Sequence, residues 1–436
     1  MVAEKRSFSQ VERAELEKKF GSRVNFNYNE IILYDHDVGA LPSLIKPLVG
    51  NTTPAGIVQP QSEDELVWLS KWAKANKIPL TPRASASSGY GGVLPVLGGL
   101  VIDLSHFNKI IGHDEKAQTV TVQGGVVWKD LEYYLSFYGL APRLVPTSAP
   151  ASTVGGWVAQ EGSGIGSYKY GWFKENVVNV RVVLANGDIR NFSGKDLDLI
   201  FGSMGTIGII TEVTLKVKPL KNTVVVAANF KSAKDLESFI TELNKSGLDI
   251  WHVGFINPTA AKLKNQLPPK IHHGHEEKGP NLPVGFIALV AFEDSSIAGQ
   301  VEKLAAKNGG QVLPADIAQH EWEQRYNPMK VKRIGPSLVP AEVVVPKSRL
   351  SQVFSEFDRL ISLPLVVEGT IVGENEVVLL GFIPHDERKF SFNFAYSLSL
   401  TVLKTAKLNY NQIVIDFLLT VVELNYNIGN DSFAFN

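Results

Sequence analysis

The first half of the chain alternates short apolar strands with amphipathic helices. Residues 9–20 space Val11, Leu16 and Phe20 among charged residues, which predicts a short helix. Gln61–Asn76 opens with Ser62 and Glu65 at the spacing of a capping box, which predicts a second helix. Further elements follow: strands over Leu100–Leu104, Thr119–Gln123 and Ile207–Val217, a helix over Val126–Tyr138, and a hairpin over Val177–Ile189 with a type I′ turn at Asn186–Gly187.

After about residue 221 the pattern becomes a regular succession of strands and helices. Such a succession is typical of an α+β unit with helices on one face of a sheet. A polar loop bounded by prolines, Pro268–Pro283, interrupts it. The predicted elements are strands over Val224–Phe230, Val284–Phe292 and Leu363–Phe382, and helices over Ala233–Asn244, Ser296–Asn308 and Ser348–Ile361.

Composition and charge narrow the function classes. The 436 residues suggest two or three domains, at roughly 100–200 residues each. The 43 basic and 44 acidic residues give a net charge of -1, so no global attraction to nucleic acid or to an acidic membrane is expected. The absence of cysteine excludes disulfides, cysteine-ligated zinc or iron–sulfur clusters and a thiol nucleophile in this chain.

The apolar segments indicate no export or membrane span. The N-terminal residues are charged and lack the apolar core of a signal peptide. The longest apolar run, Ile413–Val422, has 10 residues, includes Asp416 and is too short to cross a bilayer, so it is expected to be a buried element. A cytoplasmic location is therefore expected, with peripheral association at the inner face of the membrane left open.

Three glycine-bearing segments carry the candidate chemistry. They are PRASASSGYGG over residues 82–92, TVGGW over 153–157 with GSGIG over 162–166, and GSMGTIG over 202–208. Small residues let a backbone approach a ligand closely, and successive N–H groups bind anions such as a pyrophosphate. A Rossmann site is rejected because the third segment follows a helix-like stretch and precedes a strand, the reverse of the required order. Three such segments in one block favour a single extended ligand.

Together with KYGWFKENVVNVRVVLANGDI and FGSMGTIGIITEVTLKVKP, these segments resemble the FAD-binding domain of the vanillyl-alcohol oxidase and p-cresol methylhydroxylase superfamily. The nearest branch is the glycolate oxidase flavoprotein subunit and the FAD-linked D-lactate dehydrogenases. The resemblance implies an α+β fold with a two-subdomain FAD-binding domain of the p-cresol methylhydroxylase type, followed by an α+β cap domain with an antiparallel sheet. The implied division is a lead-in over residues 1–50, the FAD-binding domain over 51–220, the cap over 221–390, and a C-terminal segment over 391–436 that returns to the FAD domain.

The resemblance also assigns residues to the cofactor. FAD is expected to be noncovalent, because the first loop contains no His or Cys; only His106 or His113, unexpectedly placed, would change that. The implied pyrophosphate loop is Arg83, Ala84, Ser85, Ala86, Ser87, Ser88, Gly89 and Tyr90; the isoalloxazine and ribityl region is Pro146, Thr147, Thr153, Gly155, Gly156, Gly162, Gly164 and Tyr170; and the adenine-proximal backbone is Gly205, Thr206, Ile209 and Ile210.

The chain departs from the family at several positions. Ala84 and Ser85 stand where glycines are usual, so their backbone must avoid positive φ. Met204 replaces a common acidic residue. The cap lacks the family's HxGDGNxH-like motif, since Glu368–Glu376 contains no histidine, and the downstream acidic-His motif is missing too.

Candidate catalytic residues remain in the cap. The resemblance implies that Arg325 holds a substrate carboxylate, with Tyr326 and Arg333 nearby; a solvated basic helix is the alternative. The histidines at 272, 273 and 275 lack metal-ligand register, so no metal site is predicted. His252 and His320 are expected to be ordinary core or surface residues.

The resemblance predicts an FAD-dependent dehydrogenase or oxidase acting on CH–OH groups. Its expected substrate is a 2-hydroxy acid of the D-lactate or glycolate class, oxidised by hydride transfer to flavin N5, with electrons passed to a quinone, a cytochrome or a partner protein. Two alternatives stay open: an FAD-carrying subunit or electron-transfer module without a complete substrate site, with any iron–sulfur relay on another chain, and oxidation of a sugar or polyol on the same fold.

Overall fold

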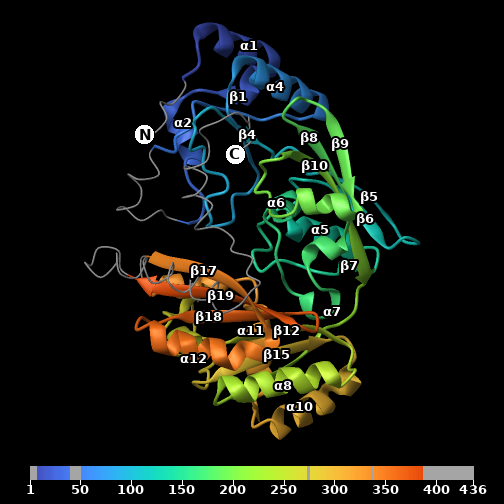
Figure 1. The fold of residues 1–436 in the computed structure, drawn as a ribbon, viewed down its shortest axis with the longest axis vertical. Helices are drawn as coiled ribbons and strands as arrows, with labels where there is room; N and C mark the ends of the chain where they lie inside the picture. The colour runs from blue at the N-terminus through green and yellow to red at the C-terminus, as the bar shows by residue number, and fades with distance from the viewer. Residues whose placement is uncertain (1–6, 40–50, 273–274, 335–336, 386–436) are drawn as a thin grey trace.

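The computed structural model describes residues 7–39, 51–272, 275–334 and 337–385. Figure 1 shows a first subdomain at the top, a second along the right-hand side and a cap domain below. The predicted element at 413–422 and the C-terminal segment 391–436 lie outside the described residues.

The first subdomain packs helices on a small sheet with the order β1-β2-β4-β3, in which β2 and β3 run parallel to β4. Both predicted helices are confirmed: Ser9 caps the first in a capping box, and the Ser62 side chain accepts a bond from the Glu65 amide at the second. The elements are α1 (Gln10–Phe20), β1 (Val24–Asn25), α2 (Tyr28–Ile31), β2 (Gly56–Val58), α4 (Glu63–Asn76), β3 (Leu80–Arg83) and β4 (Leu100–Asp103).

The second subdomain is an antiparallel sheet, β5-β6-β10-β8-β9, with β7 paired to β10. Its core surrounds Trp128, which is fully buried. The predicted strand over Thr119–Gln123 is confirmed with identical bounds because its apolar residues alternate strictly. The elements are β5 (Ile110–Asp114), β6 (Thr119–Gln123), α5 (Trp128–Ser136), β7 (Leu140–Pro142), α6 (Val154–Gln160), α7 (Ser167–Tyr170), β8 (Val177–Leu184), β9 (Ile189–Ser193) and β10 (Gly208–Pro219).

The turn predicted at Asn186–Gly187 is corrected. β8 and β9 do form a hairpin, but only Gly187 has a positive φ, at 82°. A type I′ turn requires positive φ at both residues. The Asn186 side chain instead accepts the Asp188 amide at 2.9 Å, a local bond that lets Asn186 keep a negative φ.

A polar bridge joins the two subdomains. Glu63, the first residue of α4, accepts two bonds from Arg181 of β8 at 2.7 and 2.8 Å. The Thr211 hydroxyl of β10 donates to the same carboxylate at 2.9 Å. These bonds hold the pKa of Glu63 below its usual value. Strand β10 is therefore fixed to both subdomains.

The cap domain is a seven-stranded antiparallel sheet with the order β16-β11-β15-β12-β18-β19-β17. Helices α8, α10 and α12 cover one face, the lower one in Figure 1, and enclose the largest hydrophobic core among the described residues. Helices α9 and α11 pack on the opposite face. The elements are β11 (Val224–Phe230), α8 (Ala233–Lys245), β12 (Ile250–Ile256), α9 (Pro258–Lys264), β15 (Phe286–Phe292), α10 (Ala298–Lys307), β16 (Gln311–Val312), α11 (Ala315–Glu323), β17 (Ser337–Pro346), α12 (Leu350–Leu360), β18 (Val366–Val372) and β19 (Glu376–His385).

Three details of the cap differ from the sequence prediction. The segment predicted as one strand over Leu363–Phe382 forms two strands, β18 and β19, because the chain turns at Gly373, where φ is 53°. The loop Pro268–Pro283 contains a short hairpin, β13 (Lys270–His272) and β14 (His275–Glu277). Strands β12 and β17 were not predicted.

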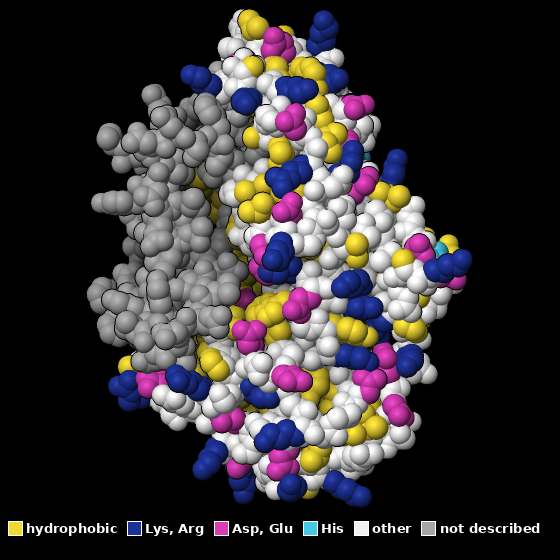
Figure 2. All heavy atoms as spheres, turned by 45° about the vertical axis from the view of Figure 1, so that its right-hand side comes forward, with side chains coloured by type: hydrophobic (Ala, Val, Ile, Leu, Met, Phe, Trp, Pro, Cys, Tyr) yellow, Lys and Arg dark blue, Asp and Glu magenta, His cyan; other side chains and the backbone are white. Residues whose placement is uncertain are grey.

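The described surface fits the balanced composition. Figure 2 shows basic and acidic side chains interspersed over the displayed face, without a broad area of one sign. Within the part of the chain that the structure describes, no helix is both long and apolar enough to cross a membrane.

Candidate active site

The first glycine-bearing loop begins where β3 ends. Arg83, its first residue, is tied to the segment before β2: its Nη1 donates to the His36 carbonyl at 2.7 Å, and its guanidinium lies 5.2 Å from the Tyr34 ring centroid. Ala84 and Ser85 avoid positive φ, and the turn falls instead on Ala86, at 51°. Arg83 thus anchors the loop to a neighbouring segment.

Asp37 holds this loop from the opposite side. Its carboxylate accepts the Gly39 amide at 2.8 Å and the Gly91 amide at 2.7 Å. The two backbones are in direct contact, since a Cβ on Gly39 would lie 2.5 Å from the Gly89 oxygen. Burial raises the pKa of Asp37, and the bonds from the Gly91 and Gly39 amides oppose that rise. The sequence analysis did not single out Asp37; its only local signal is the short Asp-x-Gly turn.

The third glycine segment faces the first. The Met204 Cε lies 3.2 Å from the position that a Cβ on Gly92 would take. Met204 and Gly205 both have positive φ, at 53° and 79°. The side chains of Ile209 and Ile210 are buried in the cores of the two subdomains, so these residues present only backbone to a ligand.

The second glycine segment is dominated by close backbone packing. Thr153 caps α6 by accepting the Gly156 amide at 3.3 Å. A Cβ on Gly155 would lie 2.6 Å from the Gly124 oxygen, and one on Gly164 would lie 2.3 Å from the Val145 oxygen. Gly162 has a φ of 143°. Pro146 is buried and Thr147 half-buried directly after Val145, and Tyr170 stacks with Arg143 at 5.3 Å.

The neighbouring glycines 155 and 156 differ in how closely other atoms pack against them. We expect Gly155→Ala to destabilise the protein by about 1–3 kcal/mol, because its Cβ would meet backbone atoms of Gly124. Gly156→Ala should cost less, because Gly156 is exposed and the one described atom that its Cβ would displace is the Thr153 hydroxyl, at 2.9 Å, rather than backbone. Denaturant unfolding of both variants measures the difference, and equal stabilities would contradict it.

The loops fit the two phosphates of an FAD. The Ser88 Oγ is buried and has no hydrogen-bond partner among the described residues, so it has a donor and acceptor to offer. Gly205 has no heavy atom within 4 Å of where its Cβ would be, so the turn opens onto free space. Small residues and positive φ on both loops are typical of backbone sites for anions. The loop over residues 83–90, predicted from the resemblance, would hold the pyrophosphate, and the facing backbone at Gly205 and Thr206 would meet the adjoining part of FAD.

A polar cluster lies where the cap meets the FAD-binding domain. Arg325, just after α11, lies 4.4 Å from the Trp322 ring and 4.3 Å from the Tyr326 ring. Its Nη1 donates to the Trp322 carbonyl at 2.8 Å, whereas its buried Nε has no partner among the described residues. The Tyr326 hydroxyl donates to Glu132 of α5, across the interface, at 3.3 Å.

This cluster adjoins the second glycine segment. Ile165 belongs to this glycine segment. Its buried side chain packs with Trp322, Tyr326 and Trp251 of the cap. Burial raises the pKa of Glu132, and the Arg325 charge and the Tyr326 bond oppose that rise. Burial raises the pKa of Tyr326 to about 12, so the phenol stays protonated at neutral pH.

His252 of β12 belongs to the same cluster. Its side chain is 7% exposed, and its ring lies 6.2 Å from that of Trp322. Nδ1 is buried and has no partner among the described residues. Burial, aided by the Arg325 charge, lowers the pKa of His252 to about 3, so the imidazole is neutral. Sequence reasoning treated His252 as an ordinary histidine because its neighbours come from distant segments.

Arg333 lies elsewhere. It ends the 3-10 helix Pro328–Arg333, and its Nη2 donates to the Pro269 carbonyl at 3.1 Å. It lines a cavity inside the cap, so the structure brings Arg325 and Tyr326 together but does not bring Arg333 to them.

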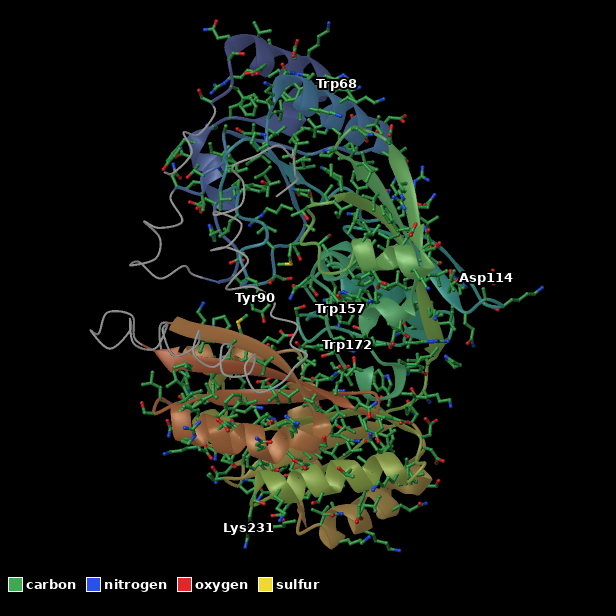
Figure 3. All side chains as sticks on the ribbon, in the orientation of Figure 1. Trp68, Tyr90, Asp114, Trp157, Trp172 and Lys231 are labelled. Carbon is green, nitrogen blue, oxygen red and sulfur yellow. The ribbon has the colours of Figure 1, made fainter. Side chains whose placement is uncertain are left out.

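Two further contacts join the domains, and Figure 3 labels the aromatic residue of each. The Tyr90 hydroxyl, at the end of the first loop, donates to Glu342 of β17 at 3.2 Å. The Trp172 indole donates to Glu376 of β19 at 2.8 Å. The loop predicted to hold the pyrophosphate therefore also contacts the cap.

Glu368 of β18 makes the free energy of unfolding depend on pH. Part of the residue is accessible, but its carboxyl lies inside the protein, and burial raises its pKa from 4.5 to about 7. Lys264 and Lys330 oppose the shift. The folded state thus binds this proton more tightly, so stability falls as pH rises from 4.5 to 7, by up to roughly 3 kcal/mol.

Glu368→Gln should remove this loss, because the amide needs no proton to stay neutral. Denaturant unfolding across this pH range should give a flatter profile for Glu368→Gln than for the wild type. Glu356→Gln, on α12, is the control and should keep the wild-type slope. An unchanged slope in Glu368→Gln would contradict the assignment.

Comparisons with known proteins agree with this architecture. Residues 54–193 match the FAD binding domain family, and residues 220–373 match the C-terminal domain family of FAD linked oxidases. The chain is 33% identical to an uncharacterized FAD-linked oxidoreductase of Mycobacterium tuberculosis, over 69% of each protein. It superposes on the structure of p-cresol methylhydroxylase with a TM-score of 0.73 at 16% identity, covering 91% of this chain and 87% of the other.

Two relatives with named activities match over less of their length. A mitochondrial D-lactate dehydrogenase [cytochrome] of Arabidopsis thaliana is 30% identical over 69% of this chain and 55% of its own length. The glycolate oxidase subunit GlcD of Bacillus subtilis is 35% identical over 39% of this chain and 38% of its own length. The chain thus spans about half or less of these two relatives.

These findings confirm the predicted α+β fold, the resemblance and the cofactor. The chain belongs to the FAD-linked oxidoreductases, with an FAD binding domain and the C-terminal domain of FAD linked oxidases, and it shares the fold of p-cresol methylhydroxylase. FAD is its cofactor.

Proposed function

We propose that the chain oxidises a 2-hydroxy acid of the D-lactate or glycolate class. The observation that carries this proposal is the position of Arg325 at the interface of the cap and the FAD-binding domain, in a cluster that packs on Ile165 of the second glycine segment. The names of the relatives from Arabidopsis thaliana and Bacillus subtilis support the substrate class.

Arg325 is suited to bind the substrate carboxylate. A guanidinium offers a fork of N–H groups that pairs with both carboxylate oxygens. The Trp322 and Tyr326 rings hold the group in place and exclude water, which strengthens the ion pair. The buried Nε without a partner is one donor that a carboxylate would satisfy.

His252 is suited to accept the hydroxyl proton. It is neutral, and its buried Nδ1 has no hydrogen bond to a described residue. Burial is the main cause of the lowered pKa of His252, and the Arg325 charge adds to it. A carboxylate paired with Arg325 would offset that charge and so make the imidazole a better base when substrate is present. When bound, FAD supplies the acceptor for the hydride from the substrate carbon.

The electrons must then leave the flavin. With no cysteine in the chain, a cysteine-ligated iron–sulfur relay would have to belong to another polypeptide. The proposed electron acceptor is a quinone, a cytochrome or a partner protein. We also propose that FAD is bound noncovalently and that the protein is cytoplasmic, with peripheral association at the membrane left open. The main alternative is an FAD-carrying subunit without its own substrate site, favoured by the missing histidine in Glu368–Glu376.

Anaerobic flavin bleaching tests these functions. The flavin of the purified chain should bleach with D-lactate or glycolate and stay oxidised with sugars and polyols. Bleaching by a polyol alone would transfer the proposal to that substrate class. No bleaching by any compound would support the subunit alternative. His252→Gln should slow bleaching at unchanged flavin content, and an unchanged rate would remove His252 from the mechanism.

A further inference from the structure

A cavity of about 280 Å³ lies inside the cap, separate from the Arg325 cluster. Its walls are the end of α9, the last turns of α11, the 3-10 helix Pro328–Arg333 and two loops, over residues 265–269 and 278–282. All of its lining residues fall between 264 and 333, so the FAD-binding domain contributes none of them. A ligand there would not contact the flavin loops.

The charges around this cavity do not balance. Four basic residues, Lys264, Lys278, Lys330 and Arg333, line it together with the acidic Glu321 and Glu323. Glu321 is already engaged by Lys264 in an ion pair of which both side chains are mostly buried. The neighbouring His320 is neutral, because burial lowers its pKa, as do the charges of Lys330 and Lys264. The lining therefore carries a formal excess of two positive charges.

Hydrogen bonds and apolar packing hold parts of the cavity wall in place. Asn265 donates to the Leu282 carbonyl and accepts the Leu282 amide, both at 2.8 Å. Leu282 is 3% exposed and packs into the small core under α9 and α11. The bond from Arg333 to the Pro269 carbonyl fixes the guanidinium at the rim. A preformed wall lowers the entropy lost when a ligand binds.

We propose that this cavity binds a small dianion with carboxylate or phosphate groups, with Lys330 and Arg333 as its main cationic contacts. The excess of two positive charges matches two negative charges on the ligand. The volume lies near the lower limit of small-molecule sites, at roughly 300 Å³, which favours a compact metabolite over a nucleotide. The proposal is independent of the substrate oxidised at the flavin.

Isothermal titration of the flavin-loaded full chain tests the site. Sulfate probes phosphate-like binding and malonate probes dicarboxylate binding, at an ionic strength kept constant with chloride. Saturable 1:1 binding of at least one probe is expected. Arg333→Gln and Lys330→Gln should each weaken it roughly tenfold. Arg359→Gln is the matched control, because Arg359 is an exposed arginine of α12 on the other face of the cap sheet.

Four results would overturn the proposal. The first three are the absence of saturable binding by both probes, equal affinities in Arg333→Gln and the wild type, and equal weakening in Arg359→Gln. Release of FAD as sulfate binds would also overturn it, because sulfate would then occupy the pyrophosphate loops. Thermal unfolding without added probe verifies that each variant is folded.

Discussion

Replacing Arg325 with Met is expected to lower kcat/KM for a 2-hydroxy acid by roughly 100- to 1000-fold, while FAD stays bound. The substitution keeps a long side chain between Trp322 and Tyr326 but removes the charge that would pair with the substrate carboxylate. Truncating one partner of a buried charge pair costs about 3–4 kcal/mol, which corresponds to that loss of rate. Anaerobic bleaching rates at several substrate concentrations measure the effect.

Two variants make this result specific. Arg325→Lys keeps the charge but loses the planar fork, so it should retain only part of the activity. Arg359→Met, on the far side of the cap, should bleach at the wild-type rate because Arg359 is exposed and pairs with Glu356 of its own helix. Bleaching of Arg325→Met at the wild-type rate, with full flavin content, would remove Arg325 from the substrate site.

Local patterns were enough to predict about half of the helices and strands of the two FAD-binding subdomains, among them the longest ones. The alternation in Thr119–Gln123 and the spacing in Gln61–Asn76 reflect one buried face each, and the structure confirms both elements. The glycine segments were also informative, because two backbones that approach closely, as at Gly155 and Gly164, leave no room for a Cβ and so require glycine in the sequence.

The cap was harder to predict because its sheet is assembled from distant strands. β12 pairs with β15 and β18, and β17 pairs with β19 at the edge of the described sheet, so neither strand has a hairpin partner next to it in the sequence. β17 also contains Pro340 at a sheet edge, where proline is tolerated, although proline argues against a strand in the sequence. The segment Leu363–Phe382 was predicted as one strand because it contains few residues that are typical of turns.

The candidate active site likewise combines residues that the sequence identified with residues that it did not. Arg325 and Tyr326 were identified from a family resemblance, but their partner Glu132 lies 194 residues away from Tyr326. His252 reaches the cluster from β12, and no spacing relates it to Arg325. Contacts at such separations are set by the packing of one domain on another, and a single sequence carries no local mark of them.

Asp37→Asn is expected to weaken FAD binding by roughly 10- to 100-fold while the protein stays folded. The Asp37 carboxylate accepts two backbone amides, those of Gly39 and Gly91, and so holds the first loop against the preceding segment. Asparagine has the same shape, but its amide NH₂ would face one of these N–H groups and leave it without an acceptor. Such a buried unsatisfied donor costs about 1–3 kcal/mol.

Equilibrium binding of FAD to the apoprotein measures the effect of Asp37→Asn directly. Asp114→Asn is the matched control: Asp114 also accepts two backbone amides, from Lys116 and Ala117, but it lies at the tip of the β5–β6 hairpin, far from the loop in Figure 3. It should leave FAD affinity unchanged. Equal affinities in Asp37→Asn and the wild type would show that the loop holds its shape without this carboxylate, and that the Arg83 bond to the His36 carbonyl is sufficient.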